Sequence, residues 1–405
     1  MQTNITKAFL KTSQGKEAES ILRSCVHCGF CTATCPTYQL LGDELDSPRG
    51  RIYLIKQVLE GNEATTKTRS HLDRCLTCRA CETTCPSGVR YGRLVDIGRE
   101  IVEQDVPRTT IENTSRYLLR QLIPYPKRFA ALLKIGQIFR PVFPQAMQTK
   151  IPKIQKSGDW PAQTQQRKML VLEGCAQQVV TAQTNVSTAV VLNKLGIQLI
   201  TADKAVCCGA VSHHLSATKE AKDFIRQNID AWWPFITEGV EAIVVTASGC
   251  GVMLKDYAHI MQDDIDYADK ANRITELAKD ISEILQGEDF SGLNTTPQKN
   301  SVSFHSPCTL QHGLKLSGVV ENILQQVGYD LKHVDDSHLC CGSAGTYSVL
   351  QPKLSKQLLA NKITALQNNQ PDIIATANIG CQMHLDTKAS VPVKHWIELV
   401  EKALR

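Results

Sequence analysis

Hydrophobic and polar positions follow two different patterns along the chain. In RIYLIKQVLE, apolar side chains recur at helical spacing, with Ser47 as a helix N-cap, Pro48 at the first helical position and Gly61 as a stop. From Lys168 onward, short apolar runs such as MLVLEG and AIVVTAS alternate with longer amphipathic segments. The first pattern predicts a helical N-terminal part, and the second predicts strands that alternate with helices and form parallel sheets.

The alternating region contains an internal duplication. We predict two helices in its first half and two in its second, at 179–195, 217–237, 317–327 and 352–368. Thirty-one residues lie between Cys175 and Cys207, and the same number lies between Cys308 and Cys340. The spacing indicates two copies of one α/β fold. In each copy the cysteines follow predicted strands, at the edge where open parallel sheets bind ligands.

Cysteine is the unusual feature of the composition, with 16 residues in 405. Hydrophobic residues make up 42% and charged residues 21%, which excludes a disordered, fibrous or small disulfide-stapled protein. The N-terminal sequence lacks the apolar segment of a signal peptide, and no apolar run reaches the ~20 residues that span a bilayer. We therefore expect a cytoplasmic protein, in which dense cysteine indicates metal binding or catalysis rather than disulfides.

Two cysteine motifs carry the clearest chemistry. CVHCGFCTATCP at 25–36 and CLTCRACETTCP at 75–86 are both C-x2-C-x2-C-x3-C-P, the pattern of bacterial two-cluster ferredoxins, in which the fourth cysteine ligates the other cluster. This pattern predicts two [4Fe–4S] clusters, the first held by Cys25, Cys28, Cys31 and Cys85, and the second by Cys75, Cys78, Cys81 and Cys35. Zinc knuckles, the alternative, would use separated C-x2-C pairs without the fourth Cys–Pro.

The spacing between the motifs suggests a particular ferredoxin type. Thirty-nine residues separate Cys35 from Cys75, too many for a compact ferredoxin turn, and they include the predicted helix. The domain resembles the α-helical ferredoxin domain of succinate dehydrogenase-type iron–sulfur subunits. Arg49 and Arg51 on this helix are candidates to offset the negative charge of a cluster, although the favoured interpretation is that both are exposed.

A basic segment follows the motifs. The net charge is only +5, yet no acidic residue lies between Glu112 and Asp159. Nine basic residues fall there: Arg116, Arg120, Lys127, Arg128, Lys134, Arg140, Lys150, Lys153 and Lys156. Interleaved apolar residues suit an anionic membrane surface or an acidic partner subunit, and a solvated linker is the equally weighted alternative. No nucleic-acid partner is expected, because the rest of the chain offers no matching basic face.

The C…CCG…C pattern, present twice, resembles the cysteine-rich CCG domains of the heterodisulfide reductase B subunit. With the ferredoxin motifs, the whole chain resembles the iron–sulfur subunits of bacterial glycolate oxidase (glycolate dehydrogenase). The segments that carry this resemblance are CVHCGFCTATCPTYQLLGDELD, SPRGRIYLIKQVLEG, DRCLTC, NIDAWWP, TASGCG, CTLQH, DSHLCCGSAGTY and TANIGCQ. Iron–sulfur subunits of lactate-utilisation or anaerobic glycerol-3-phosphate dehydrogenase complexes, and heterodisulfide reductase-like thiol-redox subunits, share this architecture and remain alternatives.

The resemblance implies an α+β multi-domain fold. We expect an α-helical ferredoxin domain with two [4Fe–4S] sites at 1–110, a basic, proline-rich connector at 111–167, and duplicated α/β CCG domains at 168–295 and 296–405. The heterodisulfide reductase pattern ends in C-x2-C, but here Met253 and His384 occupy the last position, so each repeat has four cysteines.

These four cysteines form a candidate additional site in each repeat, for [4Fe–4S], for zinc with a nearby histidine, or for no metal. The candidate sets are Cys175, Cys207, Cys208 and Cys250 in the first repeat, and Cys308, Cys340, Cys341 and Cys381 in the second. The nearby histidines are His213, His305, His312, His338 and His384.

The chain has no motif for a flavin, a nicotinamide or a nucleotide phosphate, and no nucleophile elbow. We therefore expect no catalytic residue and no flavin on this chain. The resemblance implies FAD-binding glycolate oxidase subunits as partners, which oxidise glycolate to glyoxylate and D-lactate to pyruvate. This chain would carry their electrons to a quinone or another membrane acceptor, and would lie peripherally on the cytoplasmic side of the inner membrane.

Overall fold

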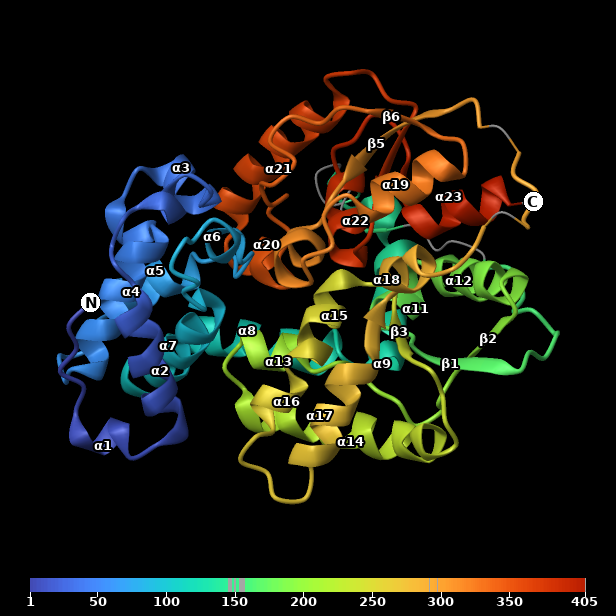
Figure 1. The fold of residues 1–405 in the computed structure, drawn as a ribbon. Coiled ribbons are helices and arrows are strands. Elements are labelled where there is room, and N and C mark those ends of the chain that lie inside the picture. The colour runs from blue at the N-terminus through green and yellow to red at the C-terminus, as the bar shows by residue number, and fades with distance from the viewer. Residues whose placement is uncertain (145–147, 149–150, 153–156, 291, 297, 405) are drawn as a thin grey trace. The chain divides into compact units, whose positions relative to one another are not determined.

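The computed structural model describes residues 1–144, 148, 151–152, 157–290, 292–296 and 298–404 (Figure 1). The chain forms two compact units. The first unit comprises Met1–Arg116 and His338–Lys362, and the second comprises Tyr117–Ser337 and Ile363–Arg405. Helices dominate the first unit, and two small parallel sheets lie in the second, which confirms the predicted α+β fold class. Among the described residues, no helix has both the length and the apolar composition needed to cross a membrane.

Short helices build the first unit. They are α1 (Lys7–Leu10), α2 (Ser13–Ser24), α3 (Pro36–Leu41), α4 (Pro48–Leu59), α5 (Thr66–Asp73), α6 (Ala80–Thr83), α7 (Tyr91–Asp105) and α20 (Tyr347–Leu350), with 3-10 turns η1 (Phe30–Thr32) and η2 (Glu44–Asp46). The predicted helix is α4: the Ser47 hydroxyl accepts a hydrogen bond from the Gly50 amide at 3.0 Å, and Gly61, with φ +95°, lies just beyond its end. Buried Ile52, Ile55 and Leu59 turn one face of α4 into the core.

Two helices form the described part of the connector. They are α8 (Thr110–Leu122) and α9 (Pro126–Ile138), followed by the 3-10 turn η3 (Arg140–Val142). Pro124 separates α8 from α9, as expected for a residue that cannot continue a helix. The predicted basic positions Lys150, Lys153 and Lys156 lie outside the described residues.

The first repeat has one four-stranded parallel sheet in the order β2-β1-β3-β4. Its strands are β1 (Arg167–Leu172), β2 (Ile197–Ile200), β3 (Ile243–Val245) and β4 (Ala278–Asp280). Its helices are α11 (Gln177–Val180), α12 (Gln183–Lys194), α13 (Ala210–His214), α14 (Thr218–Thr237), α15 (Ser248–Lys255), α16 (Tyr257–Ile260), α17 (Ala268–Leu277) and α18 (Ile281–Gln286). The helix predicted at 179–195 is divided at Thr181, which leaves the helical region of backbone space at the end of the β-branched run Val179–Thr181.

The second repeat has the same sheet topology, β6-β5-β7-β8, again all parallel. Its strands are β5 (Ser301–His305), β6 (Asp330–Lys332), β7 (Ile373–Thr376) and β8 (Val393–His395). Its helices are the π-helix η4 (Thr309–Gly313), α19 (Val319–Gln326), α21 (Pro352–Gln367), α22 (Ile379–Asp386) and α23 (Trp396–Ala403). The identical strand order confirms the duplication. One hydrophobic cluster contains Val171 and Val244 of the first sheet together with Val302 and Ala375 of the second.

Candidate cysteine sites

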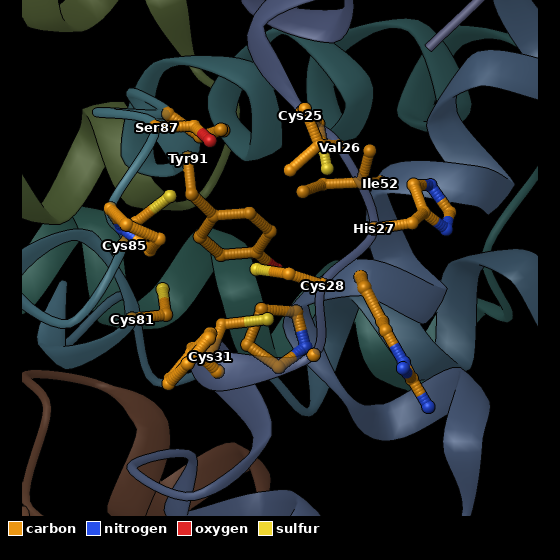
Figure 2. Close-up of a pocket in the computed structure, with 16 residues that line it drawn as sticks. Cys25, Val26, His27, Cys28, Cys31, Ile52, Cys81, Cys85, Ser87 and Tyr91 are labelled. Atoms are coloured by element: carbon orange, nitrogen blue, oxygen red, sulfur yellow. The ribbon is translucent and has the colours of Figure 1, made fainter.

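The first motif and the last cysteine of the second motif line one pocket (Figure 2). Five cysteines line it: Cys25, Cys28, Cys31 and Cys85, together with Cys81 of the second motif. Cys25 caps the end of α2, Cys31 lies in η1, and Cys85 follows α6. The structure therefore brings together the four cysteines that the ferredoxin pattern assigns to the first cluster.

Both motifs turn the chain by the same backbone conformation. The second and fourth residues after the first cysteine have positive φ in each, at His27 and Gly29 in one and at Thr77 and Arg79 in the other. Left-handed residues bend the loop sharply, so that successive thiols face the same point. At Gly29 φ is +87°, a conformation that residues with a side chain rarely adopt.

Crowding of the thiols opposes their ionisation at the first site. Burial, together with the neighbouring Cys25, Cys35 and Cys28, raises the pKa of Cys31 to about 11, although one hydrogen bond from the backbone of Arg49 acts in the opposite direction. Burial also raises the pKa of Cys25, to which Cys85 and Cys28 contribute. Several thiolates can be held here only with compensating positive charge, which iron ions supply. The donor set therefore fits an iron–sulfur cluster.

The second set gathers deeper in the protein. Burial raises the pKa of Cys81, and nearby Cys78, Cys75 and Cys35 raise it further, so these four thiols lie within electrostatic reach of one another. Burial alone would also raise the pKa of Cys75, but the guanidinium groups of Arg51 and Arg99 outweigh it and lower that pKa.

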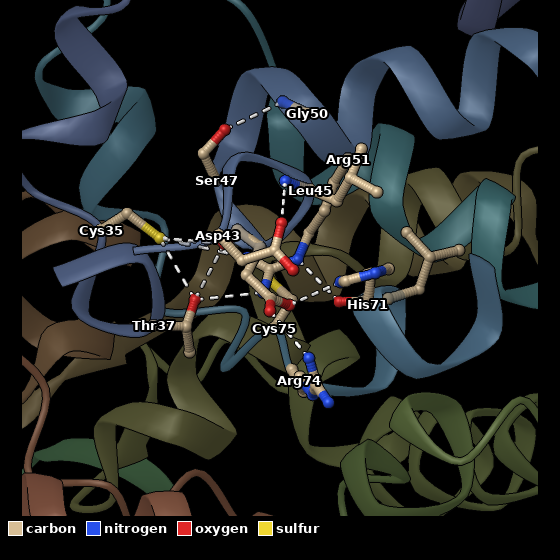
Figure 3. A network of polar contacts seen from close by, with 12 residues as sticks. Cys35, Thr37, Asp43, Leu45, Ser47, Gly50, Arg51, His71, Arg74 and Cys75 are labelled. Carbon is tan, nitrogen blue, oxygen red and sulfur yellow. Dashed lines mark hydrogen bonds and ion pairs between the residues drawn. The ribbon is translucent and has the colours of Figure 1, made fainter. Parts of the chain in front are cut away.

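A buried polar network surrounds Cys35 (Figure 3). Asp46 is fully buried and pairs with Arg51 at 3.2 Å, with Arg74 at 2.8 Å and with His71 at 3.0 Å. The expectation that Arg51 is exposed was wrong, because its side chain is 1% exposed. Its spacing of four from Ile55, on the buried face of α4, is the signal that could have revealed this. Arg49 is partly exposed, as expected, and pairs with Glu44.

The four cysteines of the first repeat meet at the carboxyl edge of the sheet, as predicted. Cys175 follows β1, Cys207 and Cys208 follow β2, and Cys250 lies in the first turn of α15. The sulfur atoms of Cys207 and Cys175 are 3.5 Å apart, and those of Cys208 and Cys250 are 3.4 Å apart. Hydrogen bonds from the Cys207 and Cys250 thiols lower the pKa of Cys208, whereas the pKa values of its two thiol neighbours are raised.

Two buried polar residues hold the adjacent Cys207 and Cys208 in place, and neither was predicted from the sequence. The Asn228 side chain on α14 accepts a hydrogen bond from the Val206 amide at 2.7 Å and donates to the Cys207 carbonyl at 2.9 Å. The Tyr257 hydroxyl donates to the Cys208 carbonyl at 2.9 Å. Met253 is 2% exposed and packs in the hydrophobic core of this repeat.

The structure divides the cysteines of the second repeat between the two units. Two loop residues separate Cys308 from the end of β5, and Cys381 lies in the first turn of α22. Both cysteines belong to the second unit. Cys340 and Cys341 belong to the segment His338–Lys362 of the first unit. The grouping of all four into one site stays a prediction. None of the chain's sixteen cysteines, all of which the structure describes, forms a disulfide.

Comparisons with known proteins agree with this organisation. The family described as "4Fe-4S dicluster domain" matches residues 21–89, and the family described as "Cysteine-rich domain" matches residues 169–255 and 302–386. In fold alone, the chain resembles the crystal structure of a hypothetical protein from Helicobacter pylori, with a TM-score of 0.57 at 10% identity, covering 99% of this chain and 73% of that chain. The two family matches identify the chain as an iron–sulfur protein.

Curated relatives narrow the family. The chain is 54% identical over 405 residues to the glycolate oxidase iron–sulfur subunit of Escherichia coli, covering 100% of this chain and 99% of that protein. It is 29% identical over 399 residues to the probable glycolate oxidase iron–sulfur subunit of Bacillus subtilis, covering 91% of this chain and 89% of that protein. It is 28% identical over 210 residues to lactate utilization protein A of Bacillus licheniformis, covering 50% of this chain and 84% of that protein. On this full-length similarity, the chain belongs to the family of glycolate oxidase iron–sulfur subunits.

Proposed function

We propose that this chain is the electron-transfer subunit of a glycolate-oxidising complex. It accepts electrons from FAD-binding subunits that convert glycolate to glyoxylate and D-lactate to pyruvate, and it passes them to a membrane quinone. The observation that carries the proposal is the convergence of eight cysteines in one helical domain of a chain whose sequence has no flavin or nicotinamide motif. The 54% identical relative, named as a glycolate oxidase subunit, supports the choice of complex.

Two sets of four cysteines hold the clusters in this proposal. Cys25, Cys28, Cys31 and Cys85 hold one cluster, and Cys75, Cys78, Cys81 and Cys35 hold the other. The shared pocket of the first set and the mutual electrostatic influence of the second support these assignments. A bound [4Fe–4S] cluster supplies one-electron transfer at a potential set by its protein surroundings.

Metal analysis tests the two cubane assignments. We expect the anaerobically purified protein to contain at least eight iron and eight acid-labile sulfide per chain, four of each for each of the two clusters. Cys28→Ser and Cys78→Ser should each remove one cluster and destabilise the domain, because cluster binding and folding are coupled. Stoichiometric zinc without broad visible absorption would refute the assignment.

We propose a further metal group, [4Fe–4S] or zinc, at the cysteines of each repeat. Two thiol pairs at 3.5 and 3.4 Å in the first repeat support such a site there. Cys208→Ser and its counterpart Cys341→Ser distinguish the roles. Loss of an iron signal from an intact complex would indicate a cluster, and loss of stoichiometric zinc would indicate a zinc site. Loss of assembly with unchanged metal would indicate a structural role for the cysteines alone.

Kinetics of the assembled complex test the division of labour. We expect the isolated chain neither to bind nor to oxidise glycolate. In the complex, Cys35→Ser should leave the flavin reducible by glycolate in a single turnover but should stop steady-state transfer to quinone. Glycolate oxidation by the isolated chain, or undiminished turnover in the Cys35 variant, would contradict the electron-transfer role.

The connector helix α9 supports peripheral binding to an anionic membrane. One face packs inward through Leu133, which is 8% exposed. The opposite face exposes Leu132 (47%), Ile135 (53%) and Ile138 (72%), and Phe139 beyond its end is 53% exposed. Basic side chains flank this apolar stripe: Lys127, Arg128, Lys134 and Arg140. Apolar side chains between basic ones match the boundary between anionic headgroups and acyl chains.

Vesicle binding tests the membrane surface. We expect the full-length chain to bind vesicles of phosphatidylglycerol more tightly than vesicles of phosphatidylcholine, and to bind less as salt rises. Replacement of the four basic residues by Gln should weaken binding to phosphatidylglycerol, and so should Leu132→Gln with Ile135→Gln. The matched control is Ile265→Gln, which changes an isoleucine that is 99% exposed elsewhere. Equal binding by all of these proteins would reduce the segment to a linker.

A further inference from the structure

A fully buried arginine lies beside the second cysteine set. The Arg51 guanidinium on α4 lies with Nη1 4.0 Å from Cys35 Sγ (Figure 3). Three other hydrogen bonds hold it in place. Its Nη2 donates to the Thr37 hydroxyl at 3.1 Å and to the Asp46 carboxylate at 3.2 Å, and its Nε donates to the His71 carbonyl at 2.7 Å. The guanidinium is therefore a fixed positive charge next to a proposed cluster ligand.

The charges around this arginine do not cancel. The Asp46 carboxylate, 0% exposed, faces two guanidinium groups, those of Arg51 and Arg74. A third guanidinium, that of Arg99, donates to the Cys75 carbonyl at 2.6 Å. Arg74 is 34% exposed, but the Arg51 side chain is only 1% exposed, so the field of Arg51 at the cysteine sulfur atoms is weakly screened.

The surroundings of the first cysteine set differ. Its neighbouring arginine, Arg49, has a side chain that is 35% exposed and paired with Glu44 at the surface. The amino terminus contacts the Cys25 carbonyl at 2.7 Å and adds a partly buried charge. Solvent screens these charges more strongly than the buried ones.

We propose that Arg51 raises the reduction potential of the cluster held by Cys35, Cys75, Cys78 and Cys81 above that of its neighbour, and so directs electrons within the domain toward this set. The inference rests on the ligand sets proposed above. Reduction adds one negative charge to a site, so a fixed positive charge stabilises the reduced form more than the oxidised form.

Redox titration followed by electron paramagnetic resonance tests the proposal on the anaerobic full-length protein. Cys28→Ser and Cys78→Ser first assign each signal to one set. Removal of the charge in Arg51→Gln should lower the ratio of reduced to oxidised cluster in the second set about tenfold at a fixed potential, which equals a midpoint about 59 mV lower. The signal of the first set should stay where it is.

Three further variants guard against simple loss of folding. Arg51→Gln weakens the pairing of buried Asp46 and destabilises the domain. Asp46→Asn instead removes the opposing negative charge, so we expect the midpoint of the second set to rise. Arg51→Lys keeps the charge and should restore a midpoint near that of the wild type. Arg49→Gln, the matched control two residues away, should leave the midpoint of the second set unchanged.

The outcomes separate this inference from the proposed function. Protein that contains no reducible iron would refute the ligand sets and the inference together. Protein that shows both signals, with a second-set midpoint that responds neither to Arg51→Gln nor to Asp46→Asn, would refute the inference alone. Equal shifts of both signals, or an equal shift caused by Arg49→Gln, would also refute it, because the effect would then lack the site selectivity that burial provides.

Discussion

Mild acid should weaken the contact between the two repeats at one buried histidine. His395, at the end of β8, is 1% exposed. Its Nε2 donates a hydrogen bond to the Thr246 carbonyl of the first repeat at 2.8 Å, and its Nδ1 accepts one from the Ile397 amide at 3.3 Å. The neutral ring satisfies both partners, whereas protonation at Nδ1 would remove the second bond. Burial lowers the pKa of His395 to about 4, although the bond to Thr246 acts in the opposite direction.

The two pKa values set the size and sign of the effect. An unfolded histidine has a pKa of about 6.5. Below that pH the unfolded state binds a proton at His395, whereas the folded state does not bind it until the pH falls to about 4. The contribution of neutral His395 to the free energy of unfolding is therefore present above about pH 6.5 and is lost as pH falls toward 4. Linkage gives a loss of about 2 kcal/mol between pH 7 and pH 5, and about 3 kcal/mol once both states are protonated.

Native-state hydrogen exchange can measure this loss locally. After correction for intrinsic rates, amides of β3 and α23 should exchange about twentyfold faster at pH 5 than at pH 7, beyond the change in His395→Asn. Asn keeps an N-cap oxygen but does not titrate. The neighbouring Glu398, whose pKa burial raises, titrates in both proteins and cancels in the comparison. His333→Asn, at a side chain 80% exposed, should behave as the wild type. The same pH dependence in wild type and His395→Asn would refute the reasoning.

Three further predictions concern the cysteine loops. Gly342→Ala should destabilise the first unit by at least ~1–2 kcal/mol in thermal unfolding, because φ is +87° and the new Cβ would lie 2.7 Å from the Ser355 carbonyl oxygen; an unchanged melting temperature would contradict this. Tyr347→Phe removes the 3.1 Å hydrogen bond to the Arg74 carbonyl, which should lower the free energy of unfolding by about 1 kcal/mol and speed proteolysis within 338–362. Equal cleavage of variant and wild type would contradict this prediction. Asn228→Ala leaves the buried Val206 amide and Cys207 carbonyl without their partner, so we expect the free energy of unfolding to fall by about 1–3 kcal/mol and the metal content of the first repeat to change. Unchanged stability and metal content would show that the loop keeps its conformation without Asn228.

Much of the candidate site follows from local sequence. The two C-x2-C-x2-C-x3-C-P runs identify eight cysteines, because short spacings and tight turns bring the first three thiols of each run together whatever the rest of the fold does. The strand order was not needed to predict the duplication, since the equal cysteine spacing of the two repeats already indicated it. The helix behind Ser47 and Pro48 was likewise predictable from its own caps.

Charges and hydrogen bonds at the sites were harder to predict. The sequence favours an exposed Arg51, because arginine is rarely buried. Its burial depends on the opposing Asp46 and on the carbonyl of His71 twenty residues away. Asn228 and Tyr257 form their bonds to the cysteine loop only once α14 and α16 pack beside it. Such partners follow no sequence period, so hydrophobic patterning does not reveal them.

By itself, the sequence determined the order of helical and α/β parts, the duplication, and the two cysteine motifs from which the ferredoxin sets are predicted, because caps, periodicity and short spacings act over a few residues. The tertiary structure alone decided that the segment with Cys340 and Cys341 belongs to the same compact unit as the N-terminal helices. There the Tyr347 hydroxyl bonds the Arg74 carbonyl across 273 residues of chain. A buried hydroxyl must find a partner, and which carbonyl meets it is set by packing among distant segments, which local sequence preferences do not encode.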